Sequence, residues 1–397
     1  MQIIILVLIA YLFMPVVGIF LLLVTGESVV AGDVTGALLF HNLNYSIIVI
    51  SIVILSYLKK RKNEINFVAS NKDCRSVFRA AVLMTLICII VFMFSGYDYL
   101  IKGVNRGDIR VGFGLFGFFY KWLTIYAIPV LMLITTILFI TNKKIKKKLI
   151  IYIYFMGVLS AFFTGYKFVV VYCLIPVFLI IFYKNNIIKV VFFITPIVLS
   201  ILTLTTKQVM GYSNYSDAFT FIIHRMTVMS AFGTIGVWEN FKDGVSLSES
   251  IKLVYNIFGN KINEYVFGID FNSIEVLDTN LSRKMTYLVY PSWEKAISGT
   301  TNITVTNFGE AIYIFGGLYW LYAIISGLIV AFFVKKVDYF ISKGDIIKTS
   351  LYYIFTAAVI LSWINSSSFL TLFSLPVFLY MFLTYVLLKF IFHTKIF

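Results

Sequence analysis

Charged residues are scarce in this 397-residue chain, where only 13% of the positions are Asp, Glu, Lys or Arg. Soluble domains have about a quarter of their residues charged, so the composition does not fit that class. Cysteine is also rare, with three residues and no CxxC spacing, which gives no indication of a zinc site or a disulfide framework. Signatures of nucleotide-binding loops, zinc peptidases and serine hydrolases are missing as well. The sequence therefore predicts no metal, no cofactor and no cytoplasmic catalytic domain.

Apolar residues dominate instead, at 60% of the chain, and the mean hydropathy is +0.94. Many windows reach the roughly 20 apolar residues that a helix needs to cross a bilayer. The first apolar stretch, 3–24, has no basic residue before it and no small-residue cleavage site after it, so we expect a retained span. The fold class expected from these patterns is an all-α polytopic membrane protein.

We expect ten transmembrane helices, with an uncertainty of about two, which gives a range of about 8–12. The expected spans cover residues 3–24, 37–58, 80–96, 115–140, 149–164, 168–183, 187–206, 311–334, 349–365 and 369–392. The chain then divides into an N-terminal membrane bundle of about seven helices (1–206), a large polar segment (207–306) and a C-terminal bundle of about three helices (307–397).

Basic residues are distributed unevenly between the two sides of this arrangement. With the N-terminus inside, the inner loops and the C-terminus hold 20 Lys and Arg but only 4 Asp and Glu. The positive-inside rule therefore places both termini in the cytoplasm and the 207–306 segment outside, as a periplasmic cap over a bacterial inner membrane. This distribution accounts for the formal charge of +15 through the lipid bilayer as partner, without nucleic acid.

Four charged residues near the apolar zone are candidates for function, because charges at membrane depth are costly: Lys121, Lys167, Arg225 and Glu310. Lys167 lies at the tip of a short helical hairpin, where it would either meet a lipid-linked phosphate or snorkel to the interface. Arg225 lies in the apolar stretch 218–237, which we expect to form an interfacial or re-entrant helix. A guanidinium fork suits phosphate oxygens, although Arg225 could also snorkel. Glu310 begins a late span, where a carboxylate either complements the helix dipole or acts as a base.

Histidine and spacing patterns add two further candidates. His224 precedes Arg225 and is either a neighbour on the polar face or a general base. Gly236 follows Arg225 by eleven positions, so the two residues share one helix face, and Arg106 has the same spacing to Gly117.

Short motifs in the chain resemble those of a known family. Residues 304–317, TVTNFGEAIYIFGG, resemble the G-E-x-Y/x-x-F-G-x-x-G start of a late membrane helix in bacterial oligosaccharide repeat-unit polymerases, the Wzy-type O-antigen and capsule polymerases. Residues 164–167, TGYK, resemble the short G-S-R-like turn between two middle helices of that family, with Lys167 where arginine is common. The Arg-x10-Gly spacings also resemble a pattern of its outer loops. Chain length, span number and the large late outer loop agree with the family too.

The resemblance implies a fold similar to metal-independent, membrane-embedded glycosyltransferases of the C-type. It also implies polymerisation of glycan repeat units on undecaprenyl pyrophosphate at the periplasmic face, for O-antigen, capsule or exopolysaccharide. A chain-length regulator and a flippase would be partners of such an enzyme. Glu310 or His224 would orient or deprotonate the acceptor hydroxyl. The cations expected to hold the pyrophosphates are Lys167, Arg225, Arg106, Arg110 and Arg283.

Three other functions are compatible with these patterns. An O-antigen ligase shares the architecture and the chemistry but transfers to a lipid A core. A flippase for lipid-linked oligosaccharides has short loops on both sides, and an outer segment of this length argues against it. A non-enzymatic membrane scaffold would not require charges at membrane depth.

Overall fold

The structure is a computed structural model that describes most of the chain. The described residues are 33–57, 71–91, 115–141, 211–258, 260–270, 273–289, 293–298, 303–366 and 368–392, with scattered positions at 14–24, 93, 151–157 and 195–207. Within these residues every regular element is a helix and no β-strand occurs, which confirms the all-α expectation. Five helices are long and apolar enough to cross a membrane: Val34–Leu55, Lys72–Val91, Gly117–Thr141, Asn307–Lys343 and Ile346–Ile364. The chain thus has the helices of a membrane protein.

The count of ten spans stays a prediction. The expected spans at 3–24, 149–164, 168–183 and 187–206 lie wholly or largely outside the described residues. The same is true of the inner and outer loops around residues 58–70, 94–114 and 142–150. The orientation of the termini is likewise a prediction from charge alone.

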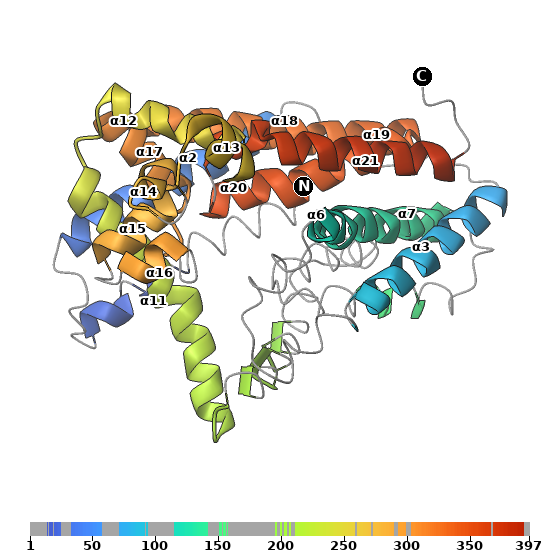
Figure 1. The fold of residues 1–397 in the computed structure, drawn as a ribbon, viewed down its shortest axis with the longest axis horizontal. Helices are drawn as coiled ribbons and strands as arrows, with labels where there is room; N and C mark the ends of the chain where they lie inside the picture. Colours follow the sequence, from blue (N-terminus) through green and yellow to red (C-terminus); the bar gives the residue numbers. More distant parts are fainter. Residues whose placement is uncertain are drawn as a thin grey trace. The chain divides into compact units, whose positions relative to one another are not determined.

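The chain forms two compact units, and the first contains residues 1–60, 212–332 and 359–378. Figure 1 shows its short helices α12–α16 gathered beside α17 and α2, while the N-terminal half of α11 extends away from them. The helices of this unit are α2 (Val34–Tyr57), α11 (Tyr215–Phe241), α12 (Leu247–Lys252), η3 (Leu253–Ile257), α13 (Asn260–Phe267), α14 (Val276–Thr279), α15 (Leu281–Val289), α16 (Trp293–Ser298), α17 (Asn307–Phe315), η4 (Gly316–Leu318), α20 (Leu361–Ser366) and η6 (Phe369–Phe373).

The second unit contains residues 61–211, 333–358 and 379–397. Its elements include α3 (Asn71–Val91), α6 (Leu115–Trp122), the π-helical turn η2 (Leu123–Ala127), α7 (Ile128–Thr141) and α19 (Ile346–Ile354). Helix α7 packs against both α3 and α19, and its residues from Ile128 to Leu138 are buried. Helices α18 (Tyr319–Lys343) and α21 (Leu375–Ile391) and the π-helical turn η5 (Phe355–Ile360) each contribute to both units. The division into 1–206, 207–306 and 307–397 stays a prediction.

Helix α2 has three polar side chains on its buried face and large apolar residues on its exposed face. His41, Asn44 and Tyr45 are buried without measurable exposure, whereas Leu39 and Ile50 are exposed. The buried and exposed sets alternate at helical spacing, so each occupies one face. Apolar side chains facing outward and polar ones facing inward are the arrangement that a lipid environment favours.

The long polar segment begins with α11, which confirms a helix over 218–237. Asn214 caps this helix by accepting a hydrogen bond from Asp217 N at 2.7 Å. At its other end Trp238 donates to Asp33 Oδ2 at 3.2 Å and stacks on Phe40 with ring centroids 4.6 Å apart. These contacts fix the end of α11 against the start of α2.

The expected span 311–334 differs from the structure in its start and continuity. Helix α17 begins at Asn307, and the path is interrupted at η4 before α18 continues to Lys343. Gly316 has φ 51° and ψ −125°, a backbone conformation outside the helical region. Glycine tolerates this conformation because it has no Cβ, so the Phe315-Gly316-Gly317 motif marks a break rather than helix interior.

The expected span 369–392 also consists of two elements. Residues Phe369–Phe373 form the 3-10 turn η6, and α21 begins only at Leu375. Ser374 between them has the extended conformation φ −69°, ψ 140°. Pro376 follows in the first turn of α21, where the missing backbone N–H of proline has no cost. The structure therefore corrects this prediction to a shorter apolar helix, Leu375–Ile391.

Candidate functional site

Glu310 is the most strongly bonded acidic side chain in the described part of the chain. The residue is only 3% exposed. Its Oε1 accepts from Ser368 Oγ at 2.7 Å and from the backbone N of Phe369 at 2.7 Å. Its Oε2 accepts from Trp363 Nε1 at 3.1 Å, from Phe369 N at 2.9 Å and from the hydroxyl of Tyr322. Both carboxylate oxygens are therefore occupied by donors.

Four elements bring these groups together. Glu310 comes from the first turn of α17 and Tyr322 from α18. Trp363 comes from α20, and Ser368 and Phe369 come from the start of η6. The rings of Trp363 and Phe369 lie 5.2 Å apart, which packs η6 against α20. A buried carboxylate is tolerated when donors compensate its lost hydration, and four donor groups do so here.

This geometry bears on the two roles considered for Glu310. A general base needs a lone pair that faces its substrate. Since both oxygens already accept hydrogen bonds from the protein, we interpret Glu310 as the anchor that joins α17 and α18 to the α20–η6 turn. The role of Glu310 as a base stays a prediction.

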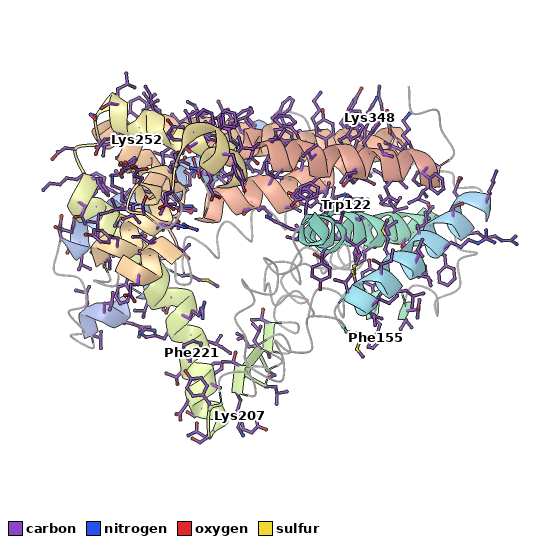
Figure 2. All side chains as sticks on the ribbon, in the orientation of Figure 1. Trp122, Phe155, Lys207, Phe221, Lys252 and Lys348 are labelled. Carbon is purple, nitrogen blue, oxygen red and sulfur yellow. The ribbon has the colours of Figure 1, made fainter. Side chains whose placement is uncertain are left out.

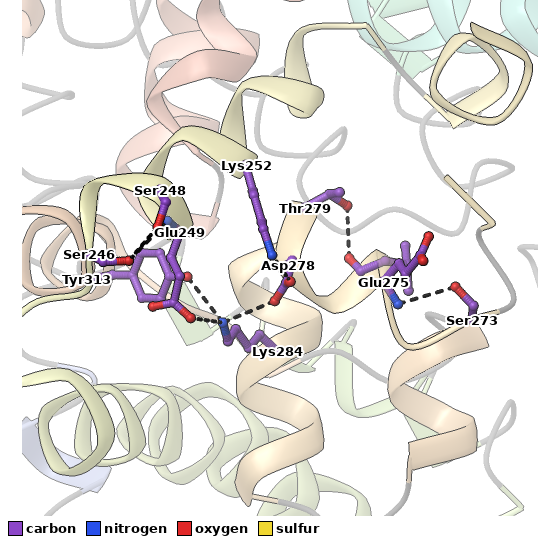
Figure 3. A network of polar contacts seen from close by, with 11 residues as sticks. Ser246, Ser248, Glu249, Lys252, Ser273, Glu275, Asp278, Thr279, Lys284 and Tyr313 are labelled. Atoms are coloured by element: carbon purple, nitrogen blue, oxygen red, sulfur yellow. Dashed lines mark hydrogen bonds and ion pairs between the residues drawn. The ribbon is translucent and has the colours of Figure 1, made fainter. Parts of the chain in front are cut away.

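Lys284 forms a second polar centre, where the cap meets α17 (Figure 3). Its Nζ lies 3.2 Å from Asp278 Oδ1, 3.8 Å from Glu249 Oε1 and 3.3 Å from the hydroxyl of Tyr313. Lys252 Nζ lies 2.6 Å from the other oxygen of Asp278. Since these residues belong to α12, α14, α15 and α17, the network ties three cap helices to the helix that carries Glu310.

The network also shifts the pKa values of its members. Burial acts to raise the pKa of Asp278, but hydrogen bonds from Lys252 and Lys284 outweigh it and lower the value. Burial acts to lower the pKa of Lys284, whereas its contacts with Tyr313 and Asp278 raise it overall. The hydrogen bond to Asp278 also raises the pKa of Lys252. All three groups stay ionised across the neutral range.

Arg283, a predicted pyrophosphate ligand, lies next to Lys284 but outside this network. Its Nη1 donates to the backbone oxygen of Ile297 at 3.0 Å and so joins α15 to α16. Burial lowers the pKa of its guanidinium. At least one of its five N–H groups therefore has a structural task.

Arg225 and His224 lie on the part of α11 that precedes its close approach to α15 at Gly236. Both side chains are exposed. The guanidinium carbon of Arg225 lies 5.9 Å from the centre of the Phe221 ring, which Figure 2 shows on the extended half of α11. Among the described residues Arg225 has no carboxylate within ion-pair distance.

Position 236 lies three helical turns after Arg225 on the same face of α11, and it has room only for glycine. A Cβ at this position would lie 2.5 Å from Val289 Cγ2 and 2.8 Å from Met285 Cε. Glycine therefore permits α11 to approach α15 closely. The face of α11 that carries Arg225 is thus the face that packs on α15, which gives the Arg-x10-Gly spacing a packing reason.

The remaining predicted cations lie outside the described residues, namely Lys167, Arg106 and Arg110. Sequence reasoning did not find Tyr322, Trp363 and Ser368 as partners of Glu310. Single polar groups in apolar runs were the available signal, but such residues are common in membrane-facing helices. In the described part of the chain no three His, Cys, Asp or Glu side chains are grouped to hold a metal ion.

Comparisons with known proteins give no further guide to this site. Neither a protein-family model nor a curated protein nor a solved structure matches the chain.

Proposed function

We propose that this protein is a membrane glycosyltransferase that joins glycan repeat units carried on undecaprenyl pyrophosphate at the outer face of a bacterial inner membrane. The observation that carries the proposal is the arrangement of helices in the first compact unit. There the long polar segment folds as helices that pack on the start of α17 and carries an exposed arginine, Arg225. The motif resemblance at residues 304–317 supports the same function.

The chemistry fits a site that supplies cations and positioning. In the proposed reaction the acceptor hydroxyl oxygen attacks the anomeric carbon of the growing chain. The bond from that carbon to the pyrophosphate oxygen breaks, and undecaprenyl pyrophosphate leaves with the electron pair. Because this bond is already activated, catalysis needs mainly orientation and stabilisation of the leaving charge.

Residue roles follow from the contacts of each side chain. Arg225 is our candidate for binding the pyrophosphate, because a guanidinium offers a planar fork of donors and this one has no described carboxylate partner. His224, which is also exposed, is the candidate acceptor for the hydroxyl proton. Glu310, Arg283 and Lys284 hold the helices that form the site. Lys167, Arg106 and Arg110 remain predicted phosphate ligands.

Deletion of the gene tests the proposal at the level of the product. Surface polysaccharide from the deletion strain is separated on a gel and compared with a strain complemented by the intact gene. We expect loss of the long-chain ladder with the single-repeat product retained. Loss of all product would point to a flippase or a ligase instead, and an unchanged ladder would refute the proposal.

A further inference from the structure

One face of η4 and α18 carries large apolar side chains that are exposed. They recur every three or four positions, and they are Leu318, Leu321, Ile325, Leu328 and Phe332. This spacing keeps all of them on one side of a helix. The helical segment Asn307–Lys343, to which they belong, is long and apolar enough to cross a membrane. We therefore interpret these residues, here called the α18 stripe, as a lipid-facing surface of the first unit.

The α18 stripe ends at η4, beside an exposed tryptophan. Trp320 lies in the first turn of α18 and is 41% exposed. Tryptophan is enriched where a membrane helix enters the headgroup region. The helix is also interrupted here, because Gly316 leaves the helical conformation. These two features place η4 at the level of a membrane interface.

The turn that precedes α12 is fixed directly on η4. Val245 N donates to the backbone oxygen of Tyr313 at 3.0 Å. A Cβ at Gly244 would lie only 3.1 Å from Gly316 N, so the two backbones approach closely at this point. Figure 1 shows α12 beside α17, and the two helices are in contact. Helix α12 therefore begins at the η4 end of the α18 stripe.

The 3-10 helix η3 continues α12 and packs against η6, the turn that leads into α21. Helix α21 is also apolar, and exposed apolar side chains occur around its start, at Phe373, Leu375 and Phe378. The α12–η3 segment, residues 247–257, thus extends from the start of α18 to the start of α21. A segment that joins the ends of two apolar helices is placed along the surface of the membrane that they enter.

The two sides of the α12–η3 segment differ in polarity. Its exposed apolar residues share one side, at spacings of four and seven, and are Leu247, Ile251 and Val254. Its charged residues turn into the cap, as Figure 3 shows. Glu249 Oε1 lies 3.8 Å from Lys284 Nζ, and Lys252 Nζ lies 2.6 Å from Asp278 Oδ2. In water a surface helix buries its apolar side and exposes its charges, and this segment does the reverse.

We propose that the α12–η3 segment is a membrane-interface anchor, whose exposed side inserts at the boundary between lipid headgroups and acyl chains. Its continuity with the α18 stripe identifies the partner as lipid. Its charged groups are engaged within the cap, so the contact depends on apolar insertion and not on the charge of the lipid headgroups. The anchor holds the cap down on the bilayer, and it is independent of the proposed glycosyltransferase activity.

Site-directed spin labelling of the full chain in phosphatidylcholine vesicles tests the anchor. Single cysteines are introduced as Leu247→Cys and Ile251→Cys after the three native cysteines are replaced by serine. Both positions are exposed, at 77% and 56%, so the label displaces no packed side chain. We expect each label to collide more often with oxygen, which concentrates in lipid, than with a water-soluble nickel complex. The result should be the same in vesicles that also contain phosphatidylglycerol.

Two reference positions calibrate the measurement. Ile325→Cys lies on the α18 stripe and should also favour oxygen, whereas Glu275→Cys is exposed in the cap and should favour the nickel complex. Labels at 247 and 251 that behave like the label at 275 would overturn the proposal. So would an aqueous label at 325, because the α18 stripe would then not face lipid.

A second copy of the chain is the other occupant that this apolar side could take. Labels at 251 that are reached by neither reagent and show dipolar coupling to one another would identify that occupant and refute the lipid anchor. Labels reached by neither reagent without coupling would show that other parts of the same chain cover the segment, which also refutes it.

Discussion

Trp363 donates its indole N–H to Glu310 Oε2 across 3.1 Å, although 53 positions separate the two residues in the chain. Trp363 is fully buried and Glu310 nearly so. In an apolar interior neither group finds water, so each depends on the other. This pair fixes the start of α17 to α20 and places the α20–η6 turn beside it.

Glu310→Gln is expected to destabilise the protein by about 1–3 kcal/mol, because the new amide N–H₂ group faces donors and leaves buried groups unpaired. The free energy of unfolding is measured by chemical denaturation in detergent. Glu264→Gln is the control, since Glu264 is exposed on α13 and its change should stay within about 0.5 kcal/mol. Equal effects of the two substitutions would show that Glu310 is not an anchor.

Gly316→Ala is expected to destabilise the break between α17 and α18. A Cβ at Gly316 would lie 2.7 Å from the backbone oxygen of Asp243 and 2.9 Å from Gly244 N, in addition to the strain of φ 51°. The cost of such backbone strain is on the order of 1–3 kcal/mol.

Gly317→Ala is the matched control for this substitution, because a Cβ at Gly317 would meet no atom within 4 Å. Tm values of both variants are compared with that of the unmodified protein. A Tm for Gly317→Ala as low as that for Gly316→Ala would contradict the assigned cause.

Lys284→Met is expected to loosen the cap from α17 while preserving the volume of the side chain. Its ammonium group has contacts with Asp278, Glu249 and Tyr313, and its side chain is 17% exposed. The carboxylates are partly exposed to water, so the loss should be about 1 kcal/mol. Limited proteolysis of the cap should become faster. Lys252→Met, which removes a more exposed ion pair, should have a smaller effect, and the reverse order would contradict this assignment.

The pH dependence of this network follows from the directions of its pKa shifts. The pKa of Asp278 is lowered, so its contribution to stability is present above the unfolded value of about 3.9 and is lost as the pH falls through the folded value. The pKa of Lys284 is raised, so its contribution is present below about 10.4 and is lost at higher pH.

The Tm difference between the unmodified protein and Lys284→Met should therefore be constant from about pH 5 to pH 9 and should shrink below about pH 4. Thermal unfolding at a series of pH values measures this difference. A steep change near neutral pH would mean that another titrating group controls the cap.

Arg225→Ala is expected to abolish long-chain product while the single-repeat product remains on its lipid carrier. Arg225→Lys should restore little activity, because a lysine is a point charge without the donor fork. Arg75→Ala is the control, since Arg75 is exposed on α3 in the other unit. The readout is the polysaccharide ladder at matched protein levels. Normal ladders from a stably expressed Arg225→Ala protein would remove Arg225 from the site.

The sequence alone determined the class of the fold and much of its segmentation. Long apolar runs predicted helices that the structure contains at α2, α7, α18 and α19, because hydrophobic length is a local property of the chain. The apolar stretch 218–237 likewise predicted helix α11. The start of α17 at Asn307, the break at Gly316 and the turn at Ser374 were not predicted, since each depends on backbone conformations that tertiary contacts select.

Tertiary structure alone decided which polar groups meet. Glu310 pairs with Trp363 and Ser368, Lys284 pairs with Tyr313, and His41 comes to lie against Phe308. These partners come from helices far apart in the chain, so no local pattern encodes them. The physical reason is that a buried polar group is stabilised only by the donors or acceptors that packing brings within about 3 Å.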